Sequence, residues 1–345
     1  MNILHIIFTL NIGGAETMLV DIVNEQSKTD NVCVVIIDDS YNNQILSTIS
    51  KSVHVELVHR KPGSKSLVPF IKLNTYILRK RPDILHIHNW QTPRILLPCF
   101  RPVFTVHGLG RPSTYYNRLR GIIAISEAVK EDVLSHGQFN VAVIPNGIVT
   151  ESVAVKTDLR RDATFKIIQV GRLKTQVKGQ DILIEAISKL QGLGHGNITL
   201  DIIGDGESKI EIQEQIERLG LSSTVNLRGS LPRREFYSHL REYDLLCQPS
   251  RKEGFGLTVA EAMIAKVPVL VSDTGGPIEI IEHGKLGYSF RSNDSFSCAI
   301  EIDRIINEYG NNEMKSKIEG AYKKAISLYS IKKMVEDYKV FYSQI

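Results

Sequence analysis

Cysteine is scarce in this chain of 345 residues, and its spacing excludes the sites that cysteines usually build. The four cysteines, Cys33, Cys99, Cys247 and Cys298, are far apart in the sequence and form no C-x-x-C pair. A disulfide framework or a structural zinc site needs closely spaced, patterned cysteines. We therefore expect reduced thiols, most of them buried.

Long apolar runs are missing as well. The segment Met1–Glu16 has no basic leader, and its apolar run stops at Thr9. Such a run is too short for a signal peptide or a membrane span. The sequence therefore predicts a cytoplasmic protein, with peripheral attachment to the inner face of the plasma membrane as an additional option.

The common nucleotide-binding motifs are also absent. The Walker pattern G-x-x-x-x-G-K-[ST] does not occur, which argues against P-loop phosphoryl transfer. The dinucleotide fingerprint G-x-G-x-x-G is incomplete in the loop Asn11–Glu16 and again at Gly204–Gly206. A dehydrogenase is therefore disfavoured. The pair Gly13-Gly14 either turns the backbone toward an anion or simply permits a tight turn.

What is present is a globular composition of two-domain length. Hydrophobic residues make up 42% of the chain and charged residues 23%. These values exclude disorder, and the length is about twice the ~150 residues of one domain.

β-branched apolar runs alternate with helix-period segments along the whole chain. The expected strands are 3–8, 32–37, 53–58, 83–88, 102–106, 121–125, 141–144, 165–170, 198–203, 224–228, 244–247 and 268–272. The expected helices are 15–27, 66–80, 127–136, 179–190, 207–219, 233–241, 257–265 and 294–308. This α/β pattern predicts two Rossmann-like, doubly wound parallel-sheet domains that face each other across a cleft.

The domain boundaries follow from the same pattern. Residues 1–150 form an N-terminal domain, the aperiodic stretch 151–164 a linker, and 165–325 a C-terminal domain. A helix over 326–345 closes the chain, and its return to the N-terminal domain is one option.

Positive charge is concentrated in the first half. The stretch Leu57–Ser126 contains twelve Lys and Arg residues and one acidic residue, Asp83. Its helix 66–80 also carries an apolar stripe, which suits an anionic membrane surface or, equally, a core-facing helix with solvated lysines. Few aromatic residues interleave with these charges, so nucleic-acid binding is disfavoured.

The second half has cations where a phosphate could bind. Arg172 follows the strand 165–170, and Lys178 precedes Gly179 at the start of a helix. A guanidinium fork and an ammonium together suit a diphosphate. Lys and Arg are also ordinary residues near a helix start, so both interpretations stay open.

Two glutamates follow the strand 244–247. Glu253 lies in a glycine-rich loop and Glu261, eight positions later, lies in the helix after it. A loop carboxylate can accept hydrogen bonds from sugar hydroxyls, and a helical one can bind a ribose diol. Gly254 and Gly256 permit close approach of the backbone.

Taken together, these residues resemble retaining glycosyltransferases of family 4, whose GT-B fold has two Rossmann-like domains. The resemblance covers essentially the whole chain and includes the E-x7-E signature. Its matches are GGAE at Gly13, TVHGLG at His107, AIS at Ser126, PNGI at Asn146, the GR…KG pair, GDGE at Gly204, EGFG..VAEAM at Glu253 and GG..EII at Gly275. One departure is Ala265–Pro268, AKVP, where relatives have A-x-G-x-P.

The resemblance implies a role for each matching residue. Arg172 and Lys178 would bind the donor diphosphate, Glu253 the transferred sugar and Glu261 the ribose. His107 would lie near the transferred sugar, and these four residues, Glu253, His107, Arg172 and Lys178, form the expected catalytic set. The donor site would also include Gly14 at the phosphate-facing loop, Gly229 and Leu231 beside the base, and the backbone of Gly254, Phe255, Gly256 and Leu257.

No metal or cofactor is expected. His86 and His88 share one side of a strand, but no acidic partner is visible beside them, since Asp83 lies at the other end of that strand. The D-x-D element that metal-dependent glycosyltransferases use is absent, and Arg172 and Lys178 would neutralise the diphosphate instead. The nucleotide sugar is a co-substrate, with UDP favoured.

The sequence thus predicts a metal-independent hexosyltransferase of the bacterial surface-polysaccharide type. It would move a hexose or N-acetylhexosamine from a nucleotide-diphosphate sugar to a carbohydrate acceptor, such as a lipid-diphosphate-linked oligosaccharide of polysaccharide, O-antigen or capsule biosynthesis. A nucleotide-sugar 2-epimerase and a two-lobed ligand-binding protein remain alternatives.

Overall fold

The computed structural model describes residues 1–11, 13–159 and 163–345, which fall into two compact units. The first unit comprises Met1–Ile148 and Leu328–Ile345, and the second comprises Val149–Ser327. The expected linker 151–164 starts within the second unit, in the 3-10 turn η3 (Thr150–Ser152). Its residues 160–162 lie outside the described part of the chain.

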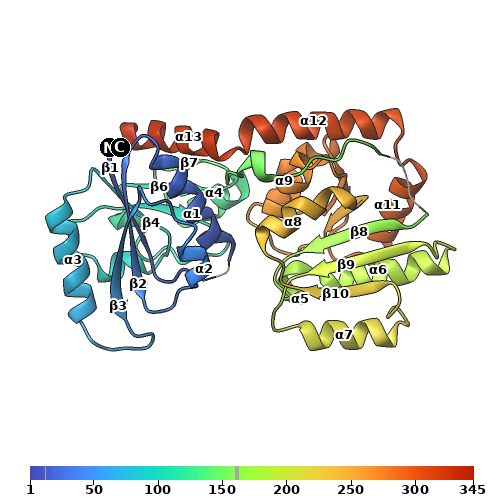
Figure 1. The fold of residues 1–345 in the computed structure, drawn as a ribbon, viewed down its shortest axis with the longest axis horizontal. Coiled ribbons are helices and arrows are strands. Elements are labelled where there is room, and N and C mark those ends of the chain that lie inside the picture. The colour runs from blue at the N-terminus through green and yellow to red at the C-terminus, as the bar shows by residue number, and fades with distance from the viewer. Residues whose placement is uncertain (12, 160–162) are drawn as a thin grey trace. The chain divides into compact units, whose positions relative to one another are not determined.

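The first unit contains a seven-stranded parallel sheet in the order β3-β2-β1-β4-β5-β6-β7 (Figure 1). Its strands are β1 (Asn2–Ile7), β2 (Asn31–Asp38), β3 (His54–Arg60), β4 (Ile84–Ile87), β5 (Val103–Val106), β6 (Gly121–Ala124) and β7 (Val141–Val143). Its helices are α1 (Gly14–Gln26), α2 (Asn43–Leu46), α3 (Val68–Lys80), α4 (Glu127–Leu134) and α13 (Ile331–Gln344), with the 3-10 turns η1 (Thr92–Ile95) and η2 (Tyr116–Arg118).

The second unit contains a six-stranded parallel sheet in the order β10-β9-β8-β11-β12-β13. Its strands are β8 (Phe165–Val170), β9 (Ile198–Ile203), β10 (Val225–Gly229), β11 (Leu245–Gln248), β12 (Val269–Ser272) and β13 (Tyr288–Phe290). Its helices are α5 (Thr175–Lys178), α6 (Gln180–Gly192), α7 (Lys209–Arg218), α8 (Arg233–His239), α9 (Leu257–Ile264), α10 (Gly275–Ile280), α11 (Ser295–Asn307) and α12 (Asn312–Leu328), with η4 (Leu240–Glu242) and η5 (Glu282–Gly284).

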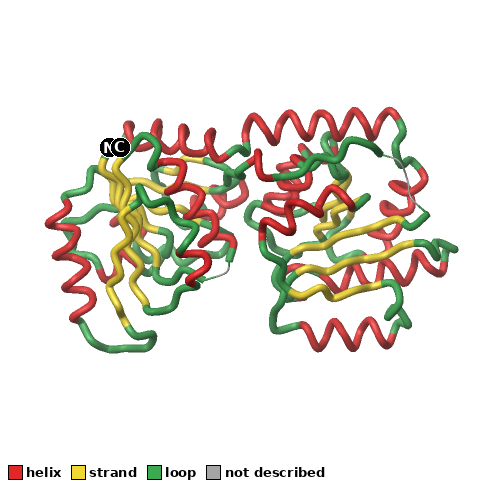
Figure 2. Tube along the Cα trace, in the orientation of Figure 1, coloured by secondary structure: helices red, strands yellow, loops and turns green. Residues whose placement is uncertain are grey.

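The predicted fold class is confirmed in both units. Within each one, helices flank a layer of parallel strands (Figure 2). The strands are buried on both faces, as the run Val34–Ile37 illustrates, because apolar side chains alternate toward helices on either side. The strand order reverses between β1 and β4 and between β8 and β11. In open α/β sheets, ligands bind at the carboxyl ends of the strands beside such a reversal.

Several elements differ from the sequence-based expectation. The short strand β13 and the helices α2, α10 and α12 were not predicted, because each is short or lacks a clear apolar period. The helix expected over 179–190 is α6, and a short helix that was not expected, α5, precedes it, with Gly179 between them at a left-handed φ of 66°.

The helix expected over 326–345 begins only at Ile331. Residues 326–328 belong to α12, and the Ser330 hydroxyl caps α13 by accepting a hydrogen bond from the Lys333 backbone N–H. A side chain that caps one helix start separates two helices that apolar periodicity alone would join.

The helix α13 packs on the first unit. The Tyr342 hydroxyl lies 2.6 Å from His86 Nδ1, and the Tyr338 hydroxyl lies 3.1 Å from Thr105 Oγ1. Gly121 permits this contact, since a Cβ there would lie 2.6 Å from the Phe341 ring. Both buried tyrosine hydroxyls thus have partners in the sheet.

The thiols are less buried than expected. Cys247 and Cys298 are buried, whereas Cys33 is half-buried and Cys99 is exposed. Within the described residues, every helix is too short or too polar to cross a lipid bilayer.

Candidate functional site

Lys178 and Glu253 form an ion pair at the strand-order reversal of the second sheet. Lys178 ends α5, which follows β8, and Glu253 lies in the loop that follows β11. Lys178 Nζ contacts Glu253 Oε2, and Gln248 Nε2 lies 3.5 Å from the same oxygen. Both side chains are mostly buried, so their charges act in a poorly screened environment. The structure therefore brings these two expected site residues together.

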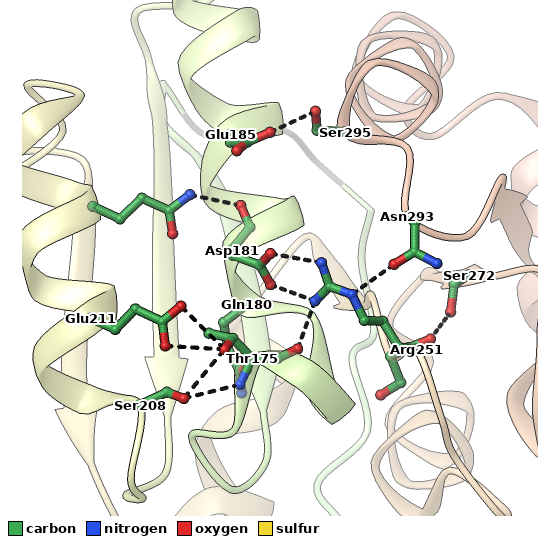
Figure 3. A network of polar contacts seen from close by, with 12 residues as sticks. Thr175, Gln180, Asp181, Glu185, Ser208, Glu211, Arg251, Ser272, Asn293 and Ser295 are labelled. Atoms are coloured by element: carbon green, nitrogen blue, oxygen red, sulfur yellow. Dashed lines mark hydrogen bonds and ion pairs between the residues drawn. The ribbon is translucent and has the colours of Figure 1, made fainter.

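Arg251 holds the loop that carries Glu253 (Figure 3). Its guanidinium donates to both carboxylate oxygens of Asp181 at 2.7 Å each, to the Thr175 carbonyl at 2.6 Å and to Asn293 Oδ1 at 2.6 Å. The backbone N–H of Arg251 also donates to the Val177 carbonyl at 2.8 Å. These contacts fix the loop against α5 and α6, which places Glu253 beside Lys178.

Glycines allow the loops of this edge to approach one another. A Cβ on Gly179 would lie 2.0 Å from the Pro249 carbonyl oxygen, and one on Gly275 would lie 2.3 Å from the Glu253 carbonyl oxygen. Gly276 donates its backbone N–H to that same Glu253 oxygen at 3.0 Å. Larger residues at Gly179 or Gly275 would push the loop around Glu253 outward.

Arg172 lies at the same edge of the second sheet, but it forms its ion pair with Glu207. Its guanidinium contacts Glu207 Oε2 at 3.1 Å, and its side chain is 70% exposed. Lys174 pairs with the other oxygen of Glu207 at 2.8 Å, and these two cations lower the pKa of that carboxyl, Lys174 more strongly. Arg172 is thus accessible to an anion, although it makes no contact with the Lys178–Glu253 pair.

Glu261 is buried in α9. Its Oε1 accepts a hydrogen bond of 2.7 Å from the Tyr237 hydroxyl, and Arg233 Nε donates to that hydroxyl at 2.7 Å. Burial, and then the Glu261 carboxylate, raise the pKa of Tyr237 well above its usual range. The phenol therefore keeps its proton and orients the carboxylate.

The remaining expected donor residues lie at the same sheet edge. Gly229 ends β10 with a φ of 69°, and its carbonyl accepts from Gly204 N–H at 2.9 Å, with Leu231 two residues farther on. Gly256 precedes α9 with a φ of 101° and offers no side-chain cap, so the first N–H groups of α9 have no such partner. Gly254, Phe255 and Leu257 flank it.

In the first unit, the expected site residues Gly14 and His107 lie in segments that follow strands of the seven-stranded sheet. Gly14 begins α1, the first helix after β1, and His107 directly follows β5. The Glu16 side chain lies over Gly13, where a Cβ would approach Glu16 Oε2 to 2.4 Å. Burial raises the pKa of Glu16. Ile12, in the same glycine loop, lies outside the described residues.

His5, His86 and His88 form the cluster of potential metal ligands in the described part of the chain, with ligand nitrogens within 4.8 Å of one another. All six ring nitrogens already have hydrogen-bond partners, including Gln26, Tyr342, Thr105 and His107. A metal ion would have to break several of these bonds. The cluster is thus chemically suited to hydrogen bonding between neutral rings.

Sequence reasoning missed Arg251, Asp181, Tyr237 and the partners of His107. Arg251 and Asp181 are seventy positions apart, and neither has a spacing that marks a pair. His5 and His88 had one available signal, since His5 lies in β1 and His88 directly follows β4, the strand that pairs with β1.

Comparison with known proteins supports a common assignment for both units. Residues 12–152 match the family described as Glycosyltransferase Family 4, and residues 155–324 match Glycosyl transferases group 1. Together the matches span most of the chain.

Two sequence relatives and one solved structure illustrate the similarity. An uncharacterized glycosyltransferase of Methanocaldococcus jannaschii is 28% identical over 67% of this chain and 68% of its own length. The poly(ribitol-phosphate) alpha-N-acetylglucosaminyltransferase of Staphylococcus aureus is 30% identical over 59% of this chain. The match covers 41% of the length of that protein. Anabaena HepE, solved in complex with UDP and glucose, superimposes with a TM-score of 0.84 at 20% identity over all of both chains.

Proposed function

The chain belongs to the family 4 glycosyltransferases and has their GT-B fold, and we propose that it is a retaining hexosyltransferase that uses a UDP-sugar. The transferred group is a hexose or N-acetylhexosamine, and the acceptor is a carbohydrate. Two similar proteins support these choices: the Staphylococcus aureus relative is an N-acetylglucosaminyltransferase, and Anabaena HepE was solved with UDP and glucose.

The observation that carries the proposal is the Lys178–Glu253 pair beside the reversal of strand order between β8 and β11. This is the position at which open α/β sheets bind nucleotides. An ammonium suits a diphosphate, and a carboxylate suits sugar hydroxyls. Both groups belong to one site on the second unit, with Arg172 nearby as a further cation for the diphosphate.

The proposed reaction breaks the bond between the anomeric carbon and the diphosphate oxygen. The acceptor hydroxyl attacks from the same face, and its proton passes to the departing diphosphate. Lys178 and Arg172 stabilise the negative charge that grows on this leaving group. Glu253 orients the sugar through its hydroxyls and is not a base. By the family resemblance, His107, at the carboxyl edge of the first sheet, is proposed to lie near the transferred sugar.

The acceptor is proposed to be lipid-linked, in polysaccharide, O-antigen or capsule biosynthesis, and the protein to act on an anionic membrane. The helix α3 supports this. Leu73, Asn74 and Ile77 are buried, whereas Leu67 and Ile71 are 68% and 64% exposed.

Cations and apolar side chains also occur together at the other end of α3. Beside the carboxyl-terminal end of α3 lies a hollow of about 660 Å³, whose lining includes Leu78, Phe100, Arg81, Arg101 and Arg120. Apolar side chains next to arginines suit a surface that carries both acyl chains and phosphates.

The transferase proposal is tested by incubating the full chain with UDP-, GDP- and ADP-sugars in the presence of oligosaccharide acceptors. Glu253→Gln should retain nucleotide binding by thermal shift and lose most turnover, because an amide accepts hydrogen bonds from hydroxyls more weakly. The exposed Glu313→Gln serves as the control and should match the wild type. Wild-type turnover in Glu253→Gln, or an inverted product by NMR, would contradict the retaining assignment.

The same assay separates the alternatives. A nucleotide-sugar 2-epimerase would convert the donor into a new sugar nucleotide without any acceptor. A ligand-binding protein would bind the nucleotide sugar and turn over neither substrate. Transfer that requires the acceptor supports the glycosyltransferase.

Membrane binding is tested by sedimentation with vesicles that contain anionic phospholipid. The double change Leu67→Ser, Ile71→Ser should abolish sedimentation, and so should Lys72→Glu, Lys80→Glu, Arg81→Glu. As a control, Leu193→Ser, Ile210→Ser removes two equally exposed apolar residues from the second unit. Persistent binding in both test variants would refute docking through α3.

We propose that the reaction needs no divalent metal ion, and the cationic side chains at the site support this. We expect EDTA to leave most of the turnover intact, because Lys178 and Arg172 supply the positive charge that a divalent ion would otherwise provide. Loss of turnover that Mn²⁺ or Mg²⁺ restores would contradict this assignment.

A further inference from the structure

Four histidines form a row in the first unit. His5 lies in β1, His86 in β4, His88 just after β4 and His107 just after β5. These strands are neighbours, and His5 is the direct register partner of His86. His5, His86 and His88 are buried, whereas His107 is half-buried. His107 is therefore the outer end of the row.

Three of the rings are linked end to end by hydrogen bonds that start at Gln26. Gln26 Oε1 lies 2.8 Å from His5 Nε2, His5 Nδ1 lies 3.0 Å from His88 Nε2, and His88 Nδ1 lies 3.2 Å from His107 Nε2. His86 is not part of this series of hydrogen bonds, because its ring nitrogens contact Tyr342 and Thr105.

All four rings are neutral at pH 7. Burial lowers the pKa of His5 and of His107 to about 4, with Arg111 adding to the effect on His107. Burial, and then the neighbouring histidines, lower the pKa of His86 and His88 well below the usual value. Each ring therefore carries a single N–H, and its other nitrogen is an acceptor.

The amide oxygen of Gln26 determines which nitrogen donates in each of these hydrogen bonds, because a carbonyl oxygen can only accept. The proton of His5 is then on Nε2, and its Nδ1 must accept from Nε2–H of His88. By the same reasoning Nδ1 of His88 accepts from Nε2–H of His107. The last ring is left with an unprotonated Nδ1.

We propose that Gln26, His5 and His88 are positioning residues that hold His107 as its Nε2–H tautomer, so that His107 Nδ1 accepts a hydrogen bond from a hydroxyl of the sugar. The identity of this partner rests on the proposed function, whereas the tautomer does not. A lone pair at Nδ1 can accept a hydrogen bond from a sugar hydroxyl, and it repels a carboxylate, which cannot donate.

The tautomer can be measured directly on the full chain. With ¹⁵N-labelled histidine, long-range ¹H–¹⁵N correlation at pH 7 distinguishes a protonated from an unprotonated ring nitrogen. We expect His107 to show a protonated Nε2 and an unprotonated Nδ1, with its signals assigned by their loss in His107→Gln. A proton on Nδ1, or an equal mixture, would overturn the proposal, and the tautomer itself is measured on the unaltered protein.

Variants of Gln26 test whether this residue determines the direction of the hydrogen bonds between the histidines. Gln26→Met removes the acceptor at similar length and should convert His107 to a mixture of tautomers. Gln26→Glu restores an acceptor and should restore the Nε2–H form. Gln44→Met, an exposed glutamine in the same unit, should change nothing. An unaltered His107 spectrum in folded Gln26→Met would show that the direction does not come from Gln26.

The consequence for turnover is a separate readout. If the chain transfers sugar, Gln26→Met should lower kcat about two- to tenfold, the value of one hydrogen bond, with nucleotide affinity unchanged. If no sugar is transferred but His107 shows the expected tautomer, the proposed function fails and the positioning role stands. If transfer occurs and the tautomer is wrong, the positioning role alone fails.

Discussion

Lys266 adopts a left-handed φ of 56° directly after α9, where glycine is the usual residue. Its N–H donates to the Met263 carbonyl at 3.2 Å, and that of Val267 donates to the Ala262 carbonyl at 2.9 Å, which is the Schellman arrangement. Lys266 Nζ also pairs with Glu319 at 2.7 Å and lies 4.5 Å from the centre of the Tyr322 ring. Contacts of the lysine side chain thus accompany a left-handed turn residue at a position where relatives have glycine.

These contacts predict different stabilities for two substitutions. Lys266→Ala keeps the backbone strain and loses the contacts, so the free energy of unfolding should fall by about 1 to 2 kcal/mol. Lys266→Gly loses the same contacts but relieves about 1 kcal/mol of strain, and should stay within about 1 kcal/mol of the wild type. Urea unfolding measures both, and equal losses in the two variants would contradict the strain argument.

Arg172 is the residue that we propose to act in the reaction rather than in folding. Arg172→Ala should leave folding intact, because its side chain is exposed. Turnover should fall roughly 10²- to 10³-fold, about 3 to 4 kcal/mol, by analogy with removal of an oxyanion-stabilising donor. Lys174→Ala is the matched control, since Lys174 shares the partner Glu207. Steady-state kinetics would contradict the assignment if both variants lost turnover equally.

Among the elements, the loop between β11 and α9 depends on a contact distant in sequence. Arg251 connects this loop to α5 and α6 through Thr175 and Asp181. The helix α3 shows the complementary case, because part of its apolar stripe packs inward and part stays exposed. Sequence periodicity alone does not show which apolar residues of α3 pack inward and which stay exposed.

The loop contact predicts a measurable coupling. Arg251→Met should lower the free energy of unfolding by about 1 to 3 kcal/mol, because it removes charged hydrogen bonds and leaves Asp181 without its partner. The double-mutant cycle with Asp181→Asn should give a coupling of about 1 kcal/mol or more. Arg291→Met, whose ion pair with Asp294 is 3.7 Å long and exposed, should change stability by less than about 0.5 kcal/mol. Equal effects of the two arginines would contradict the proposed clamp.

At the scale of the whole molecule, the histidine row makes stability depend on pH. The pKa of His5 is about 4 in the folded chain and 6.5 in the absence of burial. Between these values the unfolded chain binds a proton that the folded chain does not. Stability from this neutral ring is therefore complete above pH 6.5 and is lost as the pH falls toward 4.

We accordingly expect the free energy of unfolding to fall between pH 6.5 and 5.5 by up to about 1.4 kcal/mol for each buried histidine. Glu16 acts in the opposite sense, since its raised pKa lets the folded chain bind a proton more readily. Urea titrations at pH 7.5, 6.5 and 5.5 measure the slope. His5→Gln should reduce it, whereas exposed His136→Gln should not. A flat profile would contradict burial of neutral rings.

The sequence by itself determined the fold class, most strand and helix positions, and the family. Strand runs such as 165–170 and 198–203 matched the structure to the residue, because a doubly buried parallel strand needs an unbroken apolar run. The E-x7-E spacing, the glycine loops and the cations after β8 are local patterns, and they indicated Glu253, Glu261 and Lys178 without any coordinates.

The partners of those residues were decided only by tertiary structure. Lys178 meets Glu253 across 75 positions, Arg251 meets Asp181 across 70, and His86 meets Tyr342 across 256. Gly147, in the PNGI motif, is small because a Cβ would lie 2.6 Å from Cα of Ile331, which is a packing requirement. Local sequence fixes which backbone conformation a segment prefers, whereas hydrogen bonds between side chains depend on strand order and register. Those are set by the packing of the whole sheet and its helices.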